Sequence, residues 1–200
     1  MIGTPIFDDE SNFQQVRIKA SDHSTQNGKQ KMFENYAYHD PLTGLPNRRY
    51  FDKKLTESIE KLNIKGNGFS ILVFDIDDFH KINDRWSYEV GDQVLRIVGC
   101  RTQRAVGENG VAARIGGDEF IVLLSNNQNE EELKIIIVEL MKALSKEIIT
   151  DKDTSTITIS IGATICTKKF MSETYYIRSA DVALKKVKQS GKNQYHISHS

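Results

Sequence analysis

The sequence has 200 residues, with 27 Lys and Arg against 27 Asp and Glu, so its formal net charge at pH 7 is zero. This balance excludes a general attraction to nucleic acid or anionic lipid, and any anion must be bound by locally placed side chains. No apolar run reaches the roughly 18 residues of a membrane span, and the N-terminus lacks the layout of a signal peptide. We therefore expect a cytoplasmic chain with no nucleic-acid partner and no direct membrane insertion, which other parts of a longer protein could still tether to a membrane.

The first part of the chain contains a polar leader followed by a helix and a strand. Residues 1–28 have the composition of a leader or linker, and a short connecting helix is predicted at 29–40. Asn47 precedes apolar residues at helical spacing, which predicts a helix over about 48–63 with Asn47 as its N-cap. The apolar run FSILVFDI at 69–76 is typical of a central strand covered on both faces.

Helices and strands alternate through the remainder of the chain. The pattern predicts, in order, a helical stretch to about 84, a helix at about 89–105, a hairpin at 111–124, an amphipathic helix in NEEELKIIIVELMKALSKEI, a strand at 155–166, a helix ending at 191 and a short strand in QYHI. This order predicts an α+β domain in which helices cover a mixed or antiparallel sheet.

Carboxylates stand at two predicted strand ends, where burial would cost free energy. Asp75 follows an apolar strand, and Asp118 and Glu119 lie at the turn of the predicted hairpin. Each group has an ordinary structural explanation by itself. An aspartate after a strand is often an N-cap, and a Gly-Gly-Asp-Glu segment is often only a polar turn. Both explanations remain open for each group taken alone.

Taken together, the two groups of acids predict a metal site. If the strand at 69–76 lies beside the hairpin, Asp75 and Asp118 converge at one edge of the sheet. Two or three hard oxygen ligands suit Mg²⁺, with Mn²⁺ as the alternative, because Mg²⁺ binds a few carboxylates together with substrate phosphates. Gly116 and Gly117 would let a nucleotide approach the backbone closely. The pattern therefore predicts metal-assisted phosphoryl or nucleotidyl transfer.

Five ordered motifs make the chain similar to a known family. They are DPLTGLPNRR, FDIDDFHKINDRWSYEVGD, RIGGDEF, SIG at 160–162, and SADVAL followed by KQSGKN. With these motifs the chain resembles a GGDEF domain of the diguanylate cyclase family. We expect this domain to extend over residues 41–198. The resemblance implies a nucleotidyl-cyclase-like fold with a ferredoxin-like core and a mostly antiparallel sheet flanked by helices. It also implies a homodimer in which each GTP 3′-hydroxyl attacks the other GTP's α-phosphate, giving cyclic di-GMP and pyrophosphate.

The resemblance assigns metal-binding and catalytic roles. It implies that Asp75, the carbonyl of Ile76 and Asp118 bind the metal. Asp118 and Glu119 are the implied catalytic pair, in which Glu119 either assists deprotonation of the 3′-hydroxyl or binds metal.

The same resemblance implies how GTP is bound. Asn83 and Asp92 match the pair that reads guanine, and a carboxylate suits guanine because it accepts from N1–H and the amino group, a donor pair that adenine lacks. Lys188 and Lys192 match the residues that reach the triphosphate, although a solvated helical face is their alternative explanation. The full implied substrate set is Phe79, Asn83, Asp92, Gly116, Gly117, Lys188 and Lys192.

Several positions depart from the family pattern. They are His80, Ser87, Tyr88, Lys185 and Val187, where the family usually has Lys, Gly, His, Tyr and Ala. These departures support a second hypothesis, a weakly active or inactive domain that binds GTP and regulates an attached or partner phosphodiesterase or sensor domain. The product-inhibition motif Arg-x-x-Asp is also missing, since Gly107 and Gly110 hold its positions. We predict no feedback inhibition through that motif.

The leader has two interpretations, which both remain open. Residues 3–26 resemble the last strand and exit of a PAS sensor domain, or they are a disordered extension. A PAS domain or an EAL phosphodiesterase domain is therefore the expected partner within a longer protein.

Overall fold

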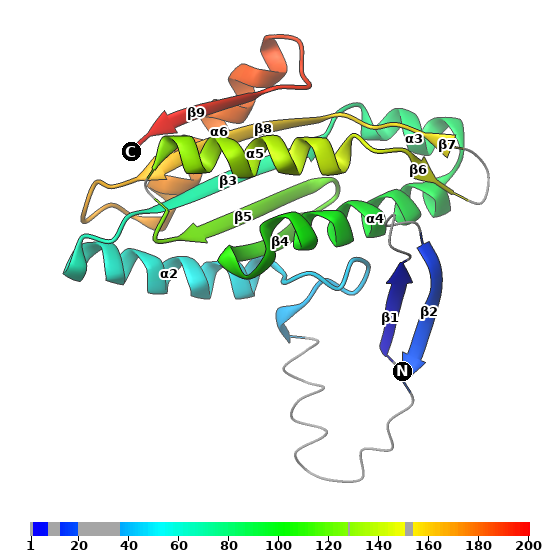
Figure 1. Cartoon of the computed structure of the whole chain (residues 1–200), viewed down its shortest axis with the longest axis horizontal. Helices are drawn as coiled ribbons and strands as arrows, with labels where there is room; N and C mark the ends of the chain where they lie inside the picture. Colours follow the sequence, from blue (N-terminus) through cyan, green and yellow to red (C-terminus); the bar gives the residue numbers. More distant parts are fainter. Residues whose placement is uncertain (1, 8–12, 20–36, 128, 151–153) are drawn as a thin grey trace, which may run out of the picture.

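Five strands form the central sheet, in the order β4-β5-β3-β8-β9 (Figure 1). β3 (Phe69–Ile76) lies in the middle and runs antiparallel to both β5 (Glu119–Ser125) and β8 (Ile159–Cys166). β4 (Gly110–Gly116) and β9 (Tyr195–His199) are the edges, and β9 runs parallel to β8. The mostly antiparallel α+β sheet is confirmed. This computed structural model describes residues 2–7, 13–19, 37–127, 129–150 and 154–200.

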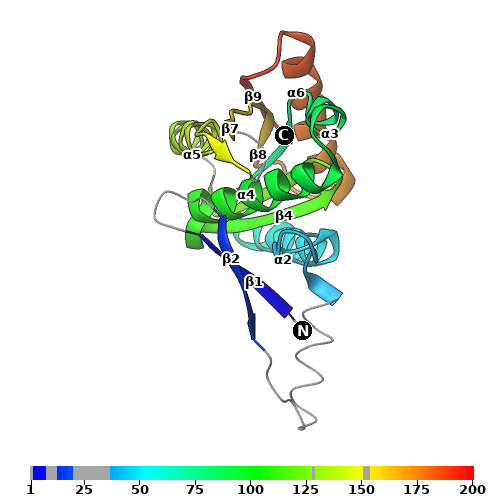
Figure 2. The same ribbon diagram turned by 90° about the vertical axis from the view of Figure 1, so that its right-hand side faces the viewer.

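Helices cover both faces of this sheet, as Figures 1 and 2 show. α4 (Tyr88–Val106) and α5 (Glu130–Leu144) pack with one face of the sheet in a single apolar cluster. α2 (Arg48–Lys65) and α6 (Glu173–Gln189) pack on the other face. The short α3 (Phe79–Arg85) joins β3 to α4. All eight residues of β3 are buried, as expected for a strand covered on both sides.

Most predicted boundaries lie within a few residues of the observed ones. Asn47 caps α2 by accepting a hydrogen bond from the backbone N–H of Tyr50, as predicted. The strand predicted at 155–166 is an exception, because β8 begins only at Ile159. Residues 156–158 leave the ladder, and the carbonyl of Thr158 accepts instead from the backbone N–H of Asp77.

Two short strands and a 3₁₀ turn complete the elements near this boundary and α4. β7 (Thr154–Ser155) pairs with β6 (Ile148–Ile149) in a small separate sheet. The 3₁₀ turn η1 (Gly107–Asn109) joins α4 to β4.

A second two-stranded sheet lies within the predicted leader. It pairs β1 (Ile2–Phe7) with β2 (Phe13–Lys19) in antiparallel fashion. The predicted connecting helix at 29–40 lies outside the described residues except for its last four, of which 37 and 38 are helical. Among the residues that the structure describes, no helix is long and apolar enough to cross a membrane.

Candidate functional site

A pocket of about 400 Å³ opens where β3 ends and α3 begins. Three segments line it: the end of β3 with α3, the turn between β4 and β5, and the end of α6 with the loop after it. The structure thus brings together a large part of the predicted site. The predicted residues in its lining are Asp75, Ile76, Phe79, Asn83, Asp118, Lys188 and Lys192.

The turn between β4 and β5 places two neighbouring acids in different surroundings. Gly116 and Gly117 have φ angles of 157° and 54°, which favour glycine and allow the tight reversal. Asp118 then lines the pocket with Asp75. Glu119 is the first residue of β5 and lies opposite Asp75 in the strand register, but its side chain lines a second cavity. The predicted pair of Asp118 and Glu119 is therefore divided between two cavities.

The predicted guanine-reading residues lie where α3 and α4 approach each other. The side-chain oxygen of Asn83 is buried and finds no hydrogen-bond partner among the residues that the structure describes. A Cβ atom at Gly91 would lie 1.9 Å from this oxygen, so glycine at 91 permits the close approach. Asp92 follows directly and is half-buried, although it does not line the pocket. The oxygen of Asn83 is thus one of the few buried and unsatisfied side-chain acceptors in the described part of the chain, and its residue borders the pocket.

Asp75 has the clearest features of a metal ligand. Its Oδ1 atom is buried and has no hydrogen-bond partner within the described ranges, while its Oδ2 atom forms an ion pair with Lys188. Burial raises the pKa of Asp75, Lys188 lowers it, and the nearby charges of Asp118 and Asp77 raise it again. A cation that contacts Oδ1 would remove much of this cost.

The donor set is small and consists of hard oxygen atoms. Within the described residues, no three His, Cys, Asp or Glu side chains gather around one point. The chain instead offers Asp75, Asp118 and the backbone of Ile76 in one pocket. This set fits Mg²⁺, which binds through one or two carboxylates and takes its remaining ligands from water and phosphate.

The two lysines of the pocket already form ion pairs with acids at the end of β3 and just after it. Lys188 pairs with Asp75, and Lys192 lies 2.9 Å from Asp78 Oδ1. Lys81 adds a third cation at 3.1 Å from the same atom of Asp78. The pocket therefore mixes both signs of charge within a few ångströms, as sites for phosphate with a metal require.

A family model described as diguanylate cyclase, GGDEF domain, matches residues 37–194. The chain belongs to the GGDEF family. The probable diguanylate cyclase DgcT of Escherichia coli K12 is 32% identical to it over 175 residues, which are 82% of this chain and 36% of that protein. The cyclic di-GMP phosphodiesterase NbdA of Pseudomonas aeruginosa is 32% identical over 157 residues, 78% of this chain and 20% of its own length. The chain thus spans well under half of either relative.

A solved structure confirms the GGDEF fold. The coiled coil and GGDEF domain of DgcB from Caulobacter crescentus, in complex with c-di-GMP, superposes with a TM-score of 0.79 at 26% identity. The match covers 87% of this chain and 91% of that one. The sequence-based assignment of the family and of its fold is therefore confirmed.

The GGDEF turn is held by an ion pair that the sequence did not predict. Arg114 Nη1 lies 3.1 Å from both carboxylate oxygens of Asp40, and Arg114 Nε and Nη2 donate to the carbonyl of Gly117 at 3.0 and 2.7 Å. Asp40 also accepts from the backbone and hydroxyl of Thr43. Burial alone would raise the pKa of Asp40, but Thr43 and Arg114 together hold it below its ordinary value. Both residues lie in recognised motifs, yet nothing in the sequence pairs positions 74 residues apart.

Asp77, two residues after Asp75, also lines the pocket, and both of its carboxylate oxygens accept hydrogen bonds from the protein. It accepts from the hydroxyls of Thr158 and Ser160 at 2.7 and 2.6 Å, and from the backbone N–H of Asn193 at 3.1 Å. These bonds tie the end of β3 to the start of β8 and to the loop after α6. Asp77 thus has a structural role in the GGDEF domain, whereas the nearby Asp75 has an Oδ1 atom without a hydrogen-bond partner among the described residues.

Two of the departures from the GGDEF pattern leave the local backbone unstrained. The backbone at Ser87 is extended (φ 162°, ψ 172°), a conformation open to any residue, so serine in place of glycine causes no strain there. Tyr88 is 79% exposed. His80 lines the pocket, where it replaces a permanent positive charge. This last change is the one that bears on phosphate binding.

Proposed function

We propose that this chain is a diguanylate cyclase, which condenses two GTP molecules into cyclic di-GMP and pyrophosphate. The pocket at the end of β3 supports this function, because it combines an unpartnered carboxylate oxygen of Asp75 with Asp118 and an unpartnered amide oxygen of Asn83. Asp75, Asp118 and the carbonyl of Ile76 would hold Mg²⁺ or Mn²⁺. When bound there, the metal would stabilise the negative charge that develops on the α-phosphoryl group during transfer.

In this proposal the other residues bind and orient GTP. Asn83 and Asp92 read the guanine edge, and Phe79 packs beside them. Lys188 and Lys192 contact the triphosphate. Gly116 and Gly117 allow the nucleotide to approach the turn, where Glu119 accepts the proton of the 3′-hydroxyl. The bond from the 3′-oxygen to the α-phosphorus forms as the bond to pyrophosphate breaks.

One domain would bind one GTP, so the reaction needs a second copy facing the first. The leader at 1–28 and the connecting helix at 29–40 would link this domain, 41–198, to a PAS or EAL domain of a longer protein. Since GTP is a cytoplasmic nucleotide, we place the domain in the cytoplasm.

The decisive experiment is a product assay with GTP and Mg²⁺ on the purified chain and on Asp118→Ala. We expect cyclic di-GMP from the natural sequence and a loss of turnover of at least about 100-fold in the variant, because a metal ligand is removed. The circular dichroism and unfolding midpoint of the variant should match those of the natural chain. Turnover that survives in Asp118→Ala would contradict the metal assignment.

A second candidate is a GTP-binding module without catalysis, which regulates a phosphodiesterase domain. The similarity to NbdA, a phosphodiesterase, and the loss of a cation at His80 favour it. GTP binding measured beside the product assay separates the two functions. Binding without product, even at high protein concentration, would support the regulatory module over the cyclase.

A further inference from the structure

A second cavity, of about 330 Å³, opens on the α2 and α6 side of the sheet. Its floor is aliphatic and includes Val73 of β3, Ile121 of β5 and Leu184 of α6, each less than 8% exposed. Its rim is charged. An aliphatic floor with a few convergent polar groups is typical of a small-molecule site, and the volume is at the lower end of the usual range of about 300–1,000 Å³.

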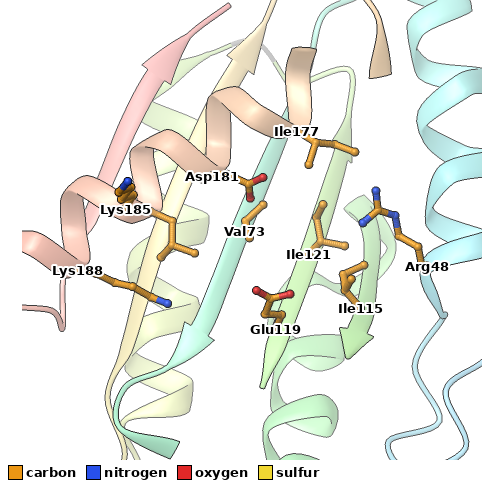
Figure 3. A pocket seen from close by; sticks show the side chains of 10 residues that line it. Arg48, Val73, Ile115, Glu119, Ile121, Ile177, Asp181, Lys185 and Lys188 are labelled. Atoms are coloured by element: carbon orange, nitrogen blue, oxygen red, sulfur yellow. The ribbon is translucent and has the colours of Figure 1, made fainter. Parts of the chain in front are cut away.

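The rim charges are arranged in a definite order, which Figure 3 shows. Arg48 of α2 stands on one side of the cavity, and Lys185 and Lys188 of α6 stand on the other. The carboxylates of Asp181 and Glu119 lie between these cations. Lys188 also lines the pocket at the end of β3, so the two cavities adjoin.

Several of these charged groups have unused hydrogen-bonding capacity. In the described part of the chain, no hydrogen bond or ion pair engages the side chains of Glu119, Asp181 or Lys185. Desolvation raises the pKa of Asp181, the charge of Glu119 raises it further, and Arg48 lowers it. Both carboxylates are solvent-exposed, and their like charges disfavour each other. A ligand with N–H groups at its centre would place hydrogen-bond donors between them.

The charge order also limits the ligand. Bare phosphate or polyphosphate would meet two carboxylates in the middle of the cavity and be repelled. A ligand must instead present donors at the centre, an anionic group at an end and a flat apolar surface to the floor. Guanosine phosphates have these three properties, because the guanine edge carries N1–H and an amino group that a carboxylate accepts together.

We propose that this second cavity binds a guanosine mononucleotide. The base lies over Val73 and Ile121, Asp181 accepts from the guanine edge, and the phosphate contacts Lys185. This site is distinct from the GTP pocket at the end of β3 and does not depend on turnover. A nucleotide there would stand beside Glu119 and Lys188, and so would influence both residues.

The test is a calorimetric titration of the whole chain with GMP, which has no pyrophosphate to lose and therefore cannot be consumed. We expect two GMP molecules per chain, one in each cavity. Asp181→Asn should remove one of them by raising its dissociation constant at least about tenfold, because a charged acceptor is lost. Asp92→Ala should remove the other. A natural chain whose GMP binding is unchanged by Asp181→Asn would overturn the inference.

Neighbouring lysines provide a matched control. Lys185 and Lys186 are both exposed on α6, but only Lys185 lines the cavity. Lys185→Ala should raise the dissociation constant of the second GMP about fivefold, as expected for one rim contact, and Lys186→Ala should leave it unchanged. Equal effects of the two substitutions would contradict the site, as would AMP binding as tightly as GMP.

The same titrations keep this inference separate from the proposed function. Two GMP sites in a chain that forms no cyclic di-GMP would support the second cavity and contradict the cyclase. Cyclic di-GMP formed by a chain with a single GMP site would support the cyclase and contradict the second cavity as a nucleotide site.

Discussion

The carboxylate of Asp75 pairs with the ammonium of Lys188 and could also bind a metal ion. Its Oδ2 atom pairs with Lys188 and its buried Oδ1 atom has no hydrogen-bond partner. Lys188 is also the residue that we assign to the triphosphate of GTP. A metal ion at Asp75 would compete with the ammonium and release it toward the phosphates. At the residue scale, metal binding and nucleotide binding should therefore be coupled.

Lys188→Met tests this coupling. Without nucleotide, Mn²⁺ should bind the variant several-fold more tightly, because the competing ammonium is absent. With metal present, GTP should bind about tenfold more weakly, since one charged contact is lost. Electron paramagnetic resonance measures the Mn²⁺ binding and calorimetry the GTP binding. Lys186→Met is the control, and Mn²⁺ affinity that is the same in both variants would contradict the competition.

The Asp40–Arg114 pair gives a second prediction for single residues. Because the pKa of Asp40 is lowered in the folded chain, its charged form stabilises the fold above the ordinary pKa of 3.8, and this stability is lost as the pH falls through the lowered pKa. Asp40→Asn should therefore reduce the free energy of unfolding by about 1–2 kcal/mol at pH 7, and the difference should shrink in acid.

Urea denaturation at several pH values measures this difference. Asp52→Asn is the control, because Asp52 forms an exposed ion pair with Arg48 and should lose less than about 0.5 kcal/mol. A difference for Asp40→Asn that stays constant down to pH 2 would argue against the ionic origin.

At the scale of elements, the position of α6 depends on one glycine of β8. A Cβ at Gly162 would lie 2.1 Å from the backbone nitrogen of Leu184 and 2.2 Å from the carbonyl of Ala180. Neither atom can move without the helix. Since α6 carries both Lys188 and the rim of the second cavity, this contact sets the spacing of both sites.

Gly162→Ala should therefore lower the free energy of unfolding by about 2–3 kcal/mol, because α6 must move away from β8. Gly99→Ala is an informative comparison. Its Cβ would meet only side chains, those of Thr43 at 3.0 Å and Leu45 at 3.5 Å, and the gain in helix propensity of about 1 kcal/mol should offset the crowding. Chemical denaturation of both variants measures the contrast, and equal losses would show that contact with α6 is not the cause.

The sequence predicted the elements well because hydrophobic periodicity reports burial, and every residue of β3 is buried as its apolar run indicates. It also predicted that Asp75 and Asp118 would meet, since both stand at strand ends. It did not separate Asp118 from Glu119, because neighbouring residues at a strand end can face different cavities. The Asp40–Arg114 pair and the second cavity depend on packing between distant segments, on which local patterns carry no information.

At the scale of the whole molecule, a single chain would hold one GTP in catalytic position. Product formation should therefore require two chains, and the rate per chain should rise with protein concentration as long as dimers are scarce. Cyclic di-GMP measured over a hundredfold range of dilution tests this expectation. A rate per chain that is constant across the whole range would contradict a reaction between two weakly associated copies.

The hydrogen bonds of Asp77 have a consequence for genetic screens. Substitutions at Asp77 release two strands and a loop at once, so cells that carry them should show a temperature-sensitive phenotype, with activity recovered on growth in the cold. Substitutions at Asp75 would remove the proposed metal ligand without loosening the fold, and their phenotype should be the same at every temperature. Two aspartates separated by one residue would thus fall into different classes of allele.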